Sequence, residues 1–166
     1  MLNSIFPLVR IAEAADLPTM VSVIAAFTIE TFLEGARTDG EHLAKMVQEG
    51  EFLLGCDRSG ELVASVYVEV RGTRGYFGML AVSPSQQGKG FGRAMVEKAE
   101  DHCRRQGCAA MDLTVLSLRQ DLPPFYHRLG YREIGTEEFH PSRRLKTGVT
   151  CHCIVMSKML GERIAR

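Results

Sequence analysis

Residues 80–93 have the sequence LAVSPSQQGKGFGR, in which three glycines alternate at the start of an amphipathic segment. The apolar residues 76–82 predict a β-strand, and residues 88–106 predict a helix because their apolar side chains recur along one face. Glycines at the start of a helix expose backbone N–H groups that have no acceptor within the helix. These groups and the helix dipole indicate a site for an anion such as a phosphate or pyrophosphate.

A glycine-rich turn can also do no more than pack a helix closely against a strand, and the motif alone leaves this interpretation open. Two other phosphate-binding loops are excluded. The stretch lacks the Gly-Lys-Ser/Thr ending of a Walker loop, and the strand lies too late in the chain for a dinucleotide fingerprint. Neither an NTPase nor a dehydrogenase is therefore favoured.

The chain has 166 residues, 45% of them hydrophobic, and its 20 Lys and Arg balance 20 Asp and Glu. A chain of this length can bury a core, so we expect a single domain over residues 1–166. Zero net charge disfavours nucleic acid or an anionic membrane as a partner, and no apolar run is long enough to span a bilayer. Five cysteines without a secretory leader predict free thiols and a cytoplasmic location.

The remaining segments predict an α/β fold. We expect strands at residues 8–12, 51–56, 61–70, 76–82, 111–115, 131–135 and 149–159, and helices after Asp16 and at residues 38–50, 88–106 and 125–129. The hairpins in this order must be antiparallel, whereas the crossover helix at residues 88–106 forces a parallel pair of strands. The sheet is therefore mixed, and a ligand is expected at the carboxyl ends of the parallel strands.

Several finer expectations concern side chains. Asp16 is expected to cap the first helix, and residues 38–41 form a capping-box pattern before the second. In the strand at residues 61–70, one face carries Leu62, Ala64, Val66, Val68 and Val70, and the other carries Val63, Ser65, Tyr67 and Glu69. Residues 76–82 are expected to be buried on both sides. On the solvent side of the helix at residues 88–106, the expected i to i+4 ion pairs are Glu100 with Arg104 and Asp101 with Arg105.

Two motifs resemble those of the GNAT superfamily of acetyl-CoA-dependent N-acetyltransferases. The signature Arg/Gln-x-x-Gly-x-Gly/Ala is matched by Gln87, Gly90 and Gly92, and residues 125–131, FYHRLGY, are similar to a second segment of the family. The resemblance covers residues 8–159. It implies a GNAT-like fold, with a central mixed sheet of six to seven strands and helices on both faces.

The resemblance also implies acetyl-CoA as cosubstrate, with its pantetheine arm between two parallel strands that splay apart. Backbone groups of Leu80 and Val82 would bind that arm, and the amides from Gln87 or Gly88 to Arg93 would hold the pyrophosphate. The residues implied in cofactor binding are Leu80, Ala81, Val82, Gln87, Gly88, Lys89, Gly90, Phe91, Gly92, Arg93 and Arg119. Arg119 departs from the family, because many members have an Asn there that contacts the pantetheine. No metal is expected, since the sequence Cys151-His152-Cys153 places His152 on the opposite face of a strand from both thiols.

The catalytic residues are interpreted by the same resemblance. Tyr126 occupies the position of a phenol near the CoA sulfur, where it would act as general acid towards the departing thiolate. The carboxylate that the family often uses as a base falls here at about Tyr76. Glu69, Glu30 or Glu34, or a water-mediated path, are the alternatives for removing the amine proton.

Two functions are compatible with these residues. The first is transfer of an acetyl group to a primary amine by direct attack in a ternary complex, and the second is an acyl-CoA-binding sensor or scaffold without a competent base. The acceptor would be a small-molecule or protein amine, and the glutamates near residues 30–34 suggest a cationic one. Arg143, Arg144 and Lys146 form a small basic loop that could meet the cofactor or be a solvated connector. A homodimer through the final strand would suit this fold.

Overall fold

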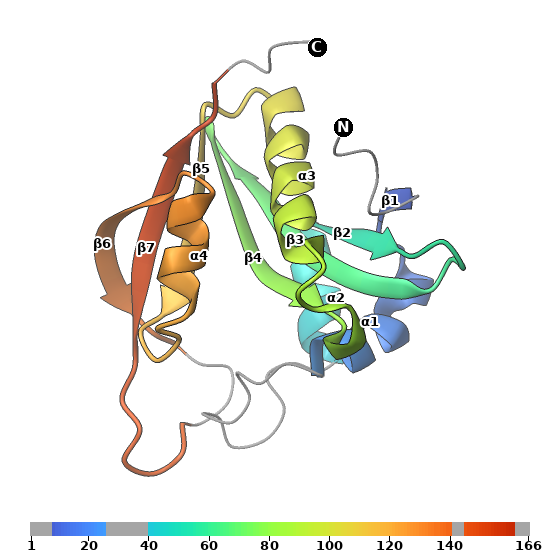
Figure 1. The fold of residues 1–166 in the computed structure, drawn as a ribbon, viewed down its shortest axis with the longest axis horizontal. Coiled ribbons are helices and arrows are strands. Elements are labelled where there is room, and N and C mark those ends of the chain that lie inside the picture. The colour runs from blue at the N-terminus through green and yellow to red at the C-terminus, as the bar shows by residue number, and fades with distance from the viewer. Residues whose placement is uncertain (1–7, 26–39, 141–144, 162–166) are drawn as a thin grey trace.

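The computed structural model describes residues 8–25, 40–140 and 145–161, which form a single sheet flanked by helices (Figure 1). The strands are β1 (Leu8–Ile11), β2 (Glu51–Cys56), β3 (Leu62–Arg71), β4 (Arg74–Val82), β5 (Ala110–Leu116), β6 (Arg132–Glu138) and β7 (His152–Met159). The helices are α1 (Leu17–Ala25), α2 (Gly40–Glu49), α3 (Phe91–Arg105) and α4 (Leu122–Arg128), with short 3-10 turns at Ala14–Asp16 and Pro84–Gln86. The predicted order of strands and helices is confirmed.

The seven strands are arranged in the order β1-β2-β3-β4-β5-β7-β6. Every neighbouring pair is antiparallel except β4 and β5, which are parallel because α3 crosses over between them. The mixed sheet expected from the sequence is therefore confirmed, with seven strands.

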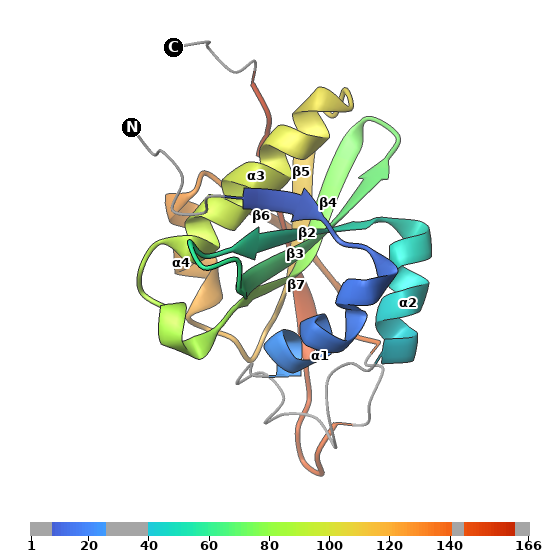
Figure 2. The same ribbon diagram turned by 90° about the vertical axis from the view of Figure 1, so that its right-hand side faces the viewer.

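Helices cover both faces of the sheet and enclose two hydrophobic clusters. The larger cluster lies between the sheet and α3 with α4, and includes Phe77, Met95 and Met111. The smaller cluster lies between the sheet and α1 with α2, and includes Met20 and Leu43 (Figure 2). In the part of the chain that the structure describes, no helix is long and apolar enough to cross a membrane.

The outer face of β3 is more buried than the alternation of its sequence suggests. Val63, Ser65 and Tyr67, which the alternation places on the same face as Glu69, are 3%, 0% and 3% exposed. Both faces of this strand are covered, since Tyr67 packs in the cluster under α1 and α2 while Val63 packs in the larger one. Strand β4 is less buried than expected. Its residues 76–82 were predicted to be buried on both sides, but Gly78, Met79 and Leu80 are only half-buried.

The expected ion pair of Glu100 with Arg104 on α3 is wrong. Glu100 is buried and its carboxylate accepts hydrogen bonds from the Lys158 ammonium of β7, at 2.7 and 3.1 Å. Arg104 instead pairs with Asp101, three residues earlier. A charged residue on the predicted solvent side of α3 thus connects this helix to the far half of the sheet. All five cysteines are free thiols, and burial raises the pKa of Cys103 to about 12.

The predicted cap of the first helix is also different from the observed one. The Asp16 carboxylate accepts a hydrogen bond from the Glu13 amide and pairs with Arg10 of β1. The carboxylate thus caps the start of the 3-10 turn before α1 and ties this turn to the first strand. Thr38 and Asp39 of the second capping pattern lie outside the described residues, as do Glu30, Glu34, Arg143 and Arg144.

Candidate active site

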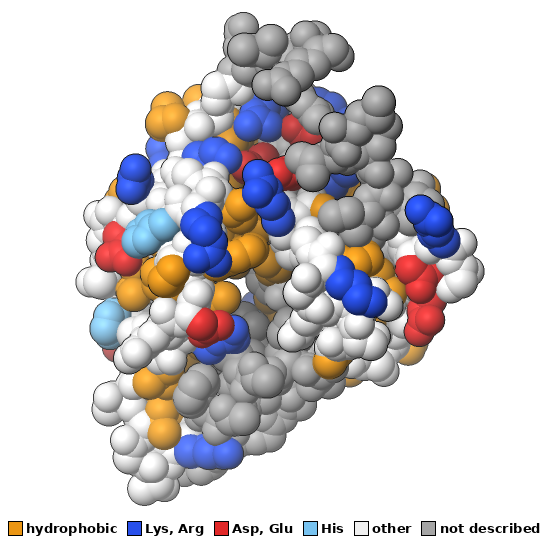
Figure 3. Space-filling view, in the orientation of Figure 1, with side chains coloured by type: hydrophobic (Ala, Val, Ile, Leu, Met, Phe, Trp, Pro, Cys, Tyr) orange, Lys and Arg blue, Asp and Glu red, His pale blue; other side chains and the backbone are white. Residues whose placement is uncertain are grey.

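The parallel strands β4 and β5 begin side by side and then separate (Figure 1). They pair through Arg74 with Ala110, Gly75 with Met111 and Tyr76 with Asp112, after which the two strands diverge. A cavity of about 600 Å³ lies along the gap, with residues of β4, β5, α3, α4 and their loops in its wall. Figure 3 shows hydrophobic side chains gathered at this hollow. The sequence-based expectation of a site at the carboxyl ends of the parallel strands agrees with this position.

Strand β4 contains a bulge beside the cavity. The register with β3 shifts between Ser65 and Tyr67, so that Val66 faces two residues of β4, Met79 and Leu80. Met79 has a φ of 49°, in the left-handed region that is unfavourable for a residue with a Cβ atom. The bulge changes which residues point to each face, because Phe77 and Leu80 both pack on the α3 side. Strained backbone of this kind is typical of binding sites.

The glycine loop forms one end of the cavity. Gly88 and Gly90 have φ values of 79° and 82°, and Gly90 is the N-cap residue of α3. The amides of the first helical turn therefore point to the cavity end without acceptors in the helix. The Gln87 side chain donates a hydrogen bond to the Val82 carbonyl at 3.1 Å, which connects the loop to the end of β4. The geometry can receive an anion at this end.

Most residues expected to bind the cofactor lie on this cavity. Its wall includes Leu80, Val82, Gln87, Gly88, Gly90, Phe91, Gly92, Arg93 and Arg119. Ala81 and Lys89 do not line it. Ala81 is fully buried on the opposite side, in the cluster under α1 and α2, and the Lys89 ammonium contacts the Gln86 side chain at 3.4 Å.

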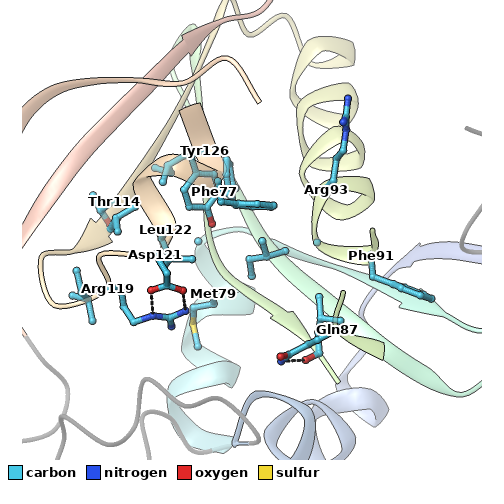
Figure 4. A pocket seen from close by; sticks show the side chains of 18 of the residues that line it. Phe77, Met79, Gln87, Phe91, Arg93, Thr114, Arg119, Asp121, Leu122 and Tyr126 are labelled. Carbon is cyan, nitrogen blue, oxygen red and sulfur yellow. Dashed lines mark hydrogen bonds and ion pairs between the residues drawn. The ribbon is translucent and has the colours of Figure 1, made fainter. Parts of the chain in front are cut away.

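Tyr126 lies at the other end of the cavity, on α4. This helix begins with two prolines in its first turn, which lack the N–H groups that would be unsatisfied there. The Tyr126 ring packs against Phe77 with centroids 5.9 Å apart, is 6% exposed, and turns its hydroxyl into the cavity (Figure 4). A phenol held in this way can donate a proton to a group placed in the gap.

Arg119 and Asp121 form an ion pair on the wall between these two ends. The guanidinium donates to both carboxylate oxygens, at 3.0 and 2.9 Å (Figure 4). Arg119 holds the pKa of Asp121 below its usual value. Asp121 provides the only carboxylate among the described residues that line the cavity.

Glu69, the first alternative for a base, does not line the cavity. Its carboxylate accepts hydrogen bonds from Arg71 at 2.9 Å and from the Tyr67 hydroxyl at 3.0 Å. The Arg71 guanidinium lowers the pKa of Glu69, while burial and the bond to Glu69 raise the pKa of Tyr67. A carboxylate with a lowered pKa is a weaker base. Glu30 and Glu34, the other carboxylates considered as the base, lie outside the described residues.

A second ion pair fastens the strands just before they separate. Arg74 of β4 donates to both oxygens of Asp112 on β5, at 2.7 and 2.6 Å, and also to the Ser157 hydroxyl of β7. The Arg74 guanidinium holds the pKa of Asp112 below its usual value. These residues had no motif in the sequence, because they come together only across three strands.

Comparison with known proteins identifies the family. A model of the acetyltransferase (GNAT) domain matches residues 18–142, which is most of the chain. The chain therefore belongs to the GNAT acetyltransferase family, a family that uses acetyl-CoA. This confirms the resemblance seen in the two sequence motifs.

Individual relatives match over parts of their length. A mycothiol acetyltransferase of Propionibacterium freudenreichii is 29% identical over 130 residues, which are 74% of this chain and 42% of the relative. An acetyltransferase of Yersinia enterocolitica is 29% identical over 92 residues, 55% of this chain and 65% of the relative. The matches thus span less than two thirds of either relative.

Solved structures share the fold. The ribosomal-protein-S18-alanine N-acetyltransferase of Escherichia coli has a TM-score of 0.74 at 20% identity, covering 96% of this chain and 99% of its own. The yncA protein of Salmonella typhimurium, solved with its cofactor acetyl-CoA, has a TM-score of 0.68 at 19% identity and covers 96% of both chains.

We predict that Asp112→Asn destabilises the protein in a pH-dependent way. The lowered pKa of folded Asp112 means that its carboxylate stabilises the fold above an unfolded pKa of about 4, and that this contribution is lost as pH falls through the folded pKa. In urea unfolding at pH 7, the free energy of unfolding should fall by about 1 kcal/mol. The loss is modest because Arg74 and Asp112 are both partly exposed.

The difference in the free energy of unfolding between Asp112→Asn and the wild type should become smaller below about pH 4. The control is Glu97→Gln, which removes a carboxylate from an exposed pair with Arg93 and should change the free energy of unfolding by less than about 0.5 kcal/mol. A loss for Asp112→Asn that is the same at pH 3 and pH 7 contradicts the prediction.

Proposed function

We propose that the chain transfers the acetyl group of acetyl-CoA to a primary amine by direct attack in a ternary complex. The observation that supports this is a single cavity between the separated strands β4 and β5, with the glycine loop of α3 at one end and Tyr126 at the other. The loop fits a pyrophosphate, and the phenol fits the protonation of a departing thiolate.

The cofactor would lie along the gap in this order. The amides of the first turn of α3 hold the pyrophosphate, and the pantetheine arm passes Leu80 and Val82, whose side chains pack on the α3 side. A bulge leaves one residue without a ladder partner, which supports the Leu80 amide as a donor to the thioester oxygen. Arg93 and Arg119 also lie on the wall, each paired with an acid, Glu97 and Asp121 respectively.

The chemical step then requires three events. The amine attacks the thioester carbon and forms the C–N bond, the C–S bond breaks, and the CoA thiolate receives a proton from Tyr126. The amine proton leaves through water or through a carboxylate, with Glu69, Glu30 or Glu34 as the proposed alternatives. Solvent returns a proton to the Tyr126 phenolate. Acceptor and donor must be bound together, because no covalent acetyl-enzyme is part of this route.

The structure also gives a reason to keep the second function, an acyl-CoA sensor of the same fold. Among the described residues, Asp121 is the only acid on the cavity and it is ion-paired with Arg119. A sensor binds acetyl-CoA without turnover. The deciding experiment follows release of the CoA thiol with glucosamine, spermidine and an alanine-initiated tetrapeptide between pH 6 and 9. Amine-dependent release supports the enzyme, whereas binding of acetyl-CoA with no release for any amine supports the sensor.

In that assay we predict that Tyr126→Phe lowers kcat by about 100-fold, because loss of a general acid typically removes that much rate. The ring and its packing on Phe77 are retained, so the Kd for acetyl-CoA measured by calorimetry should change less than about threefold. An unchanged kcat would remove Tyr126 from the chemical step.

We further predict that Gly90→Ala weakens acetyl-CoA binding by about tenfold. A Cβ atom at a φ of 82° costs about 1 kcal/mol, and relief of this strain moves the amides at the start of α3. The control is Gly60→Ala, which introduces the same strain at a φ of 87° in the turn between β2 and β3. Equal Kd values for the two variants in calorimetric titrations would contradict an anion site at the loop.

A further inference from the structure

The Tyr76 hydroxyl bridges β4 and β5 at the point where they begin to separate. Tyr76 is the last residue of β4 in register with β5, opposite Asp112. Its hydroxyl oxygen lies 3.4 Å from Oγ1 of Thr114, which is the next residue on that face of β5 and lines the cavity. The phenol therefore lies beside a residue of the cavity wall, on one face of the sheet, although Tyr76 itself does not line the cavity.

Gly78, two residues after Tyr76 in β4, makes room for this hydroxyl. A Cβ atom on Gly78 would come within 2.9 Å of the Tyr76 hydroxyl oxygen and 3.2 Å of its ring carbon Cε1. Such contacts are closer than van der Waals packing allows. Glycine at position 78 thus lets the phenol lie over the strand towards the cavity, which Gly78 itself lines.

Three side chains of β3 hold the ring in place. The Arg71 guanidinium carbon lies 4.3 Å from the Tyr76 ring centroid, a distance at which cation and ring attract. Arg71 is in turn fixed by two hydrogen bonds to Glu69, and Glu69 accepts the Tyr67 hydroxyl. A side chain ordered in advance by such contacts is suited to binding a ligand.

Two phenols consequently lie on opposite faces of the strand separation. Tyr126 packs on Phe77 on the α3 side, whereas Tyr76 packs with the cluster under α1 and α2. In the proposed complex, a thioester in the gap with its sulfur near Tyr126 would be attacked from the other face. That face is the one on which the Tyr76 and Thr114 hydroxyls meet.

We infer that Tyr76, with Thr114, is an acceptor-binding residue that orients the amine for attack, an inference that rests on the proposed function. Each hydroxyl has lone pairs that can accept a hydrogen bond from an amine N–H. Orientation of the nitrogen towards the carbonyl carbon accelerates transfer without any bond to the tyrosine being made or broken. Glu69 then contributes through Arg71 to the position of the ring.

The test is Tyr76→Phe, which removes one oxygen and keeps the ring under Arg71. With whichever of glucosamine, spermidine or the alanine-initiated tetrapeptide the wild type acetylates fastest, kcat/KM for the amine should fall about tenfold. KM for acetyl-CoA should change less than about twofold, because the hydroxyl faces the acceptor and not the cofactor.

The matched control is Tyr131→Phe. The Tyr131 hydroxyl is buried and has no hydrogen-bond partner among the described residues, so its removal should leave kcat/KM for the amine within about twofold. Thr114→Ser should retain the activity and Thr114→Val should lose it, which separates the hydroxyl from the volume of the side chain.

Three results would overturn the inference about Tyr76. A wild type that turns over an amine while Tyr76→Phe keeps its kcat/KM overturns the inference alone. Equal losses for the amine and for acetyl-CoA would place the hydroxyl at the cofactor and also overturn it. A wild type that binds acetyl-CoA but acetylates no amine removes the proposed function and this inference together.

Discussion

The structure depends on one constraint: two parallel strands that share a sheet stop pairing partway along their length. Beyond Tyr76 and Asp112, the facing backbone groups of β4 and β5 no longer serve each other as partners. Polar groups of the backbone need partners, and an extended ligand with amides can supply them. The Arg74–Asp112 pair is placed where it closes the sheet immediately before this opening.

The bulge in β4 gives the two faces of the opening different chemistry. Phe77 and Leu80 turn to α3 and α4, where Tyr126 and an apolar wall lie. Tyr76 turns the other way, towards Thr114. In the proposed reaction, donor and acceptor would approach the same gap from opposite sides without competing for one surface, as a ternary complex requires.

Charged side chains around the opening are mostly neutralised in pairs. Arg119 is paired with Asp121, Arg71 with Glu69, and Arg74 with Asp112. In the proposed function, attraction for the anionic cofactor is therefore left to the backbone amides and dipole at the start of α3, whose glycines allow a close approach. This agrees with a chain that has zero net charge and a glycine loop at the start of α3.

The sequence by itself determined the order of elements, the mixed sheet and the glycine loop, because these follow from local periodicity and from the backbone freedom of glycine. The motifs at Gln87 and Tyr126 further indicated the family. Burial of Glu100 against Lys158 and the meeting of Tyr76 with Thr114 were decided only by tertiary structure. Each joins residues of different strands or helices, and a bulge such as that at Met79 shifts the facing of side chains without any mark in the local sequence.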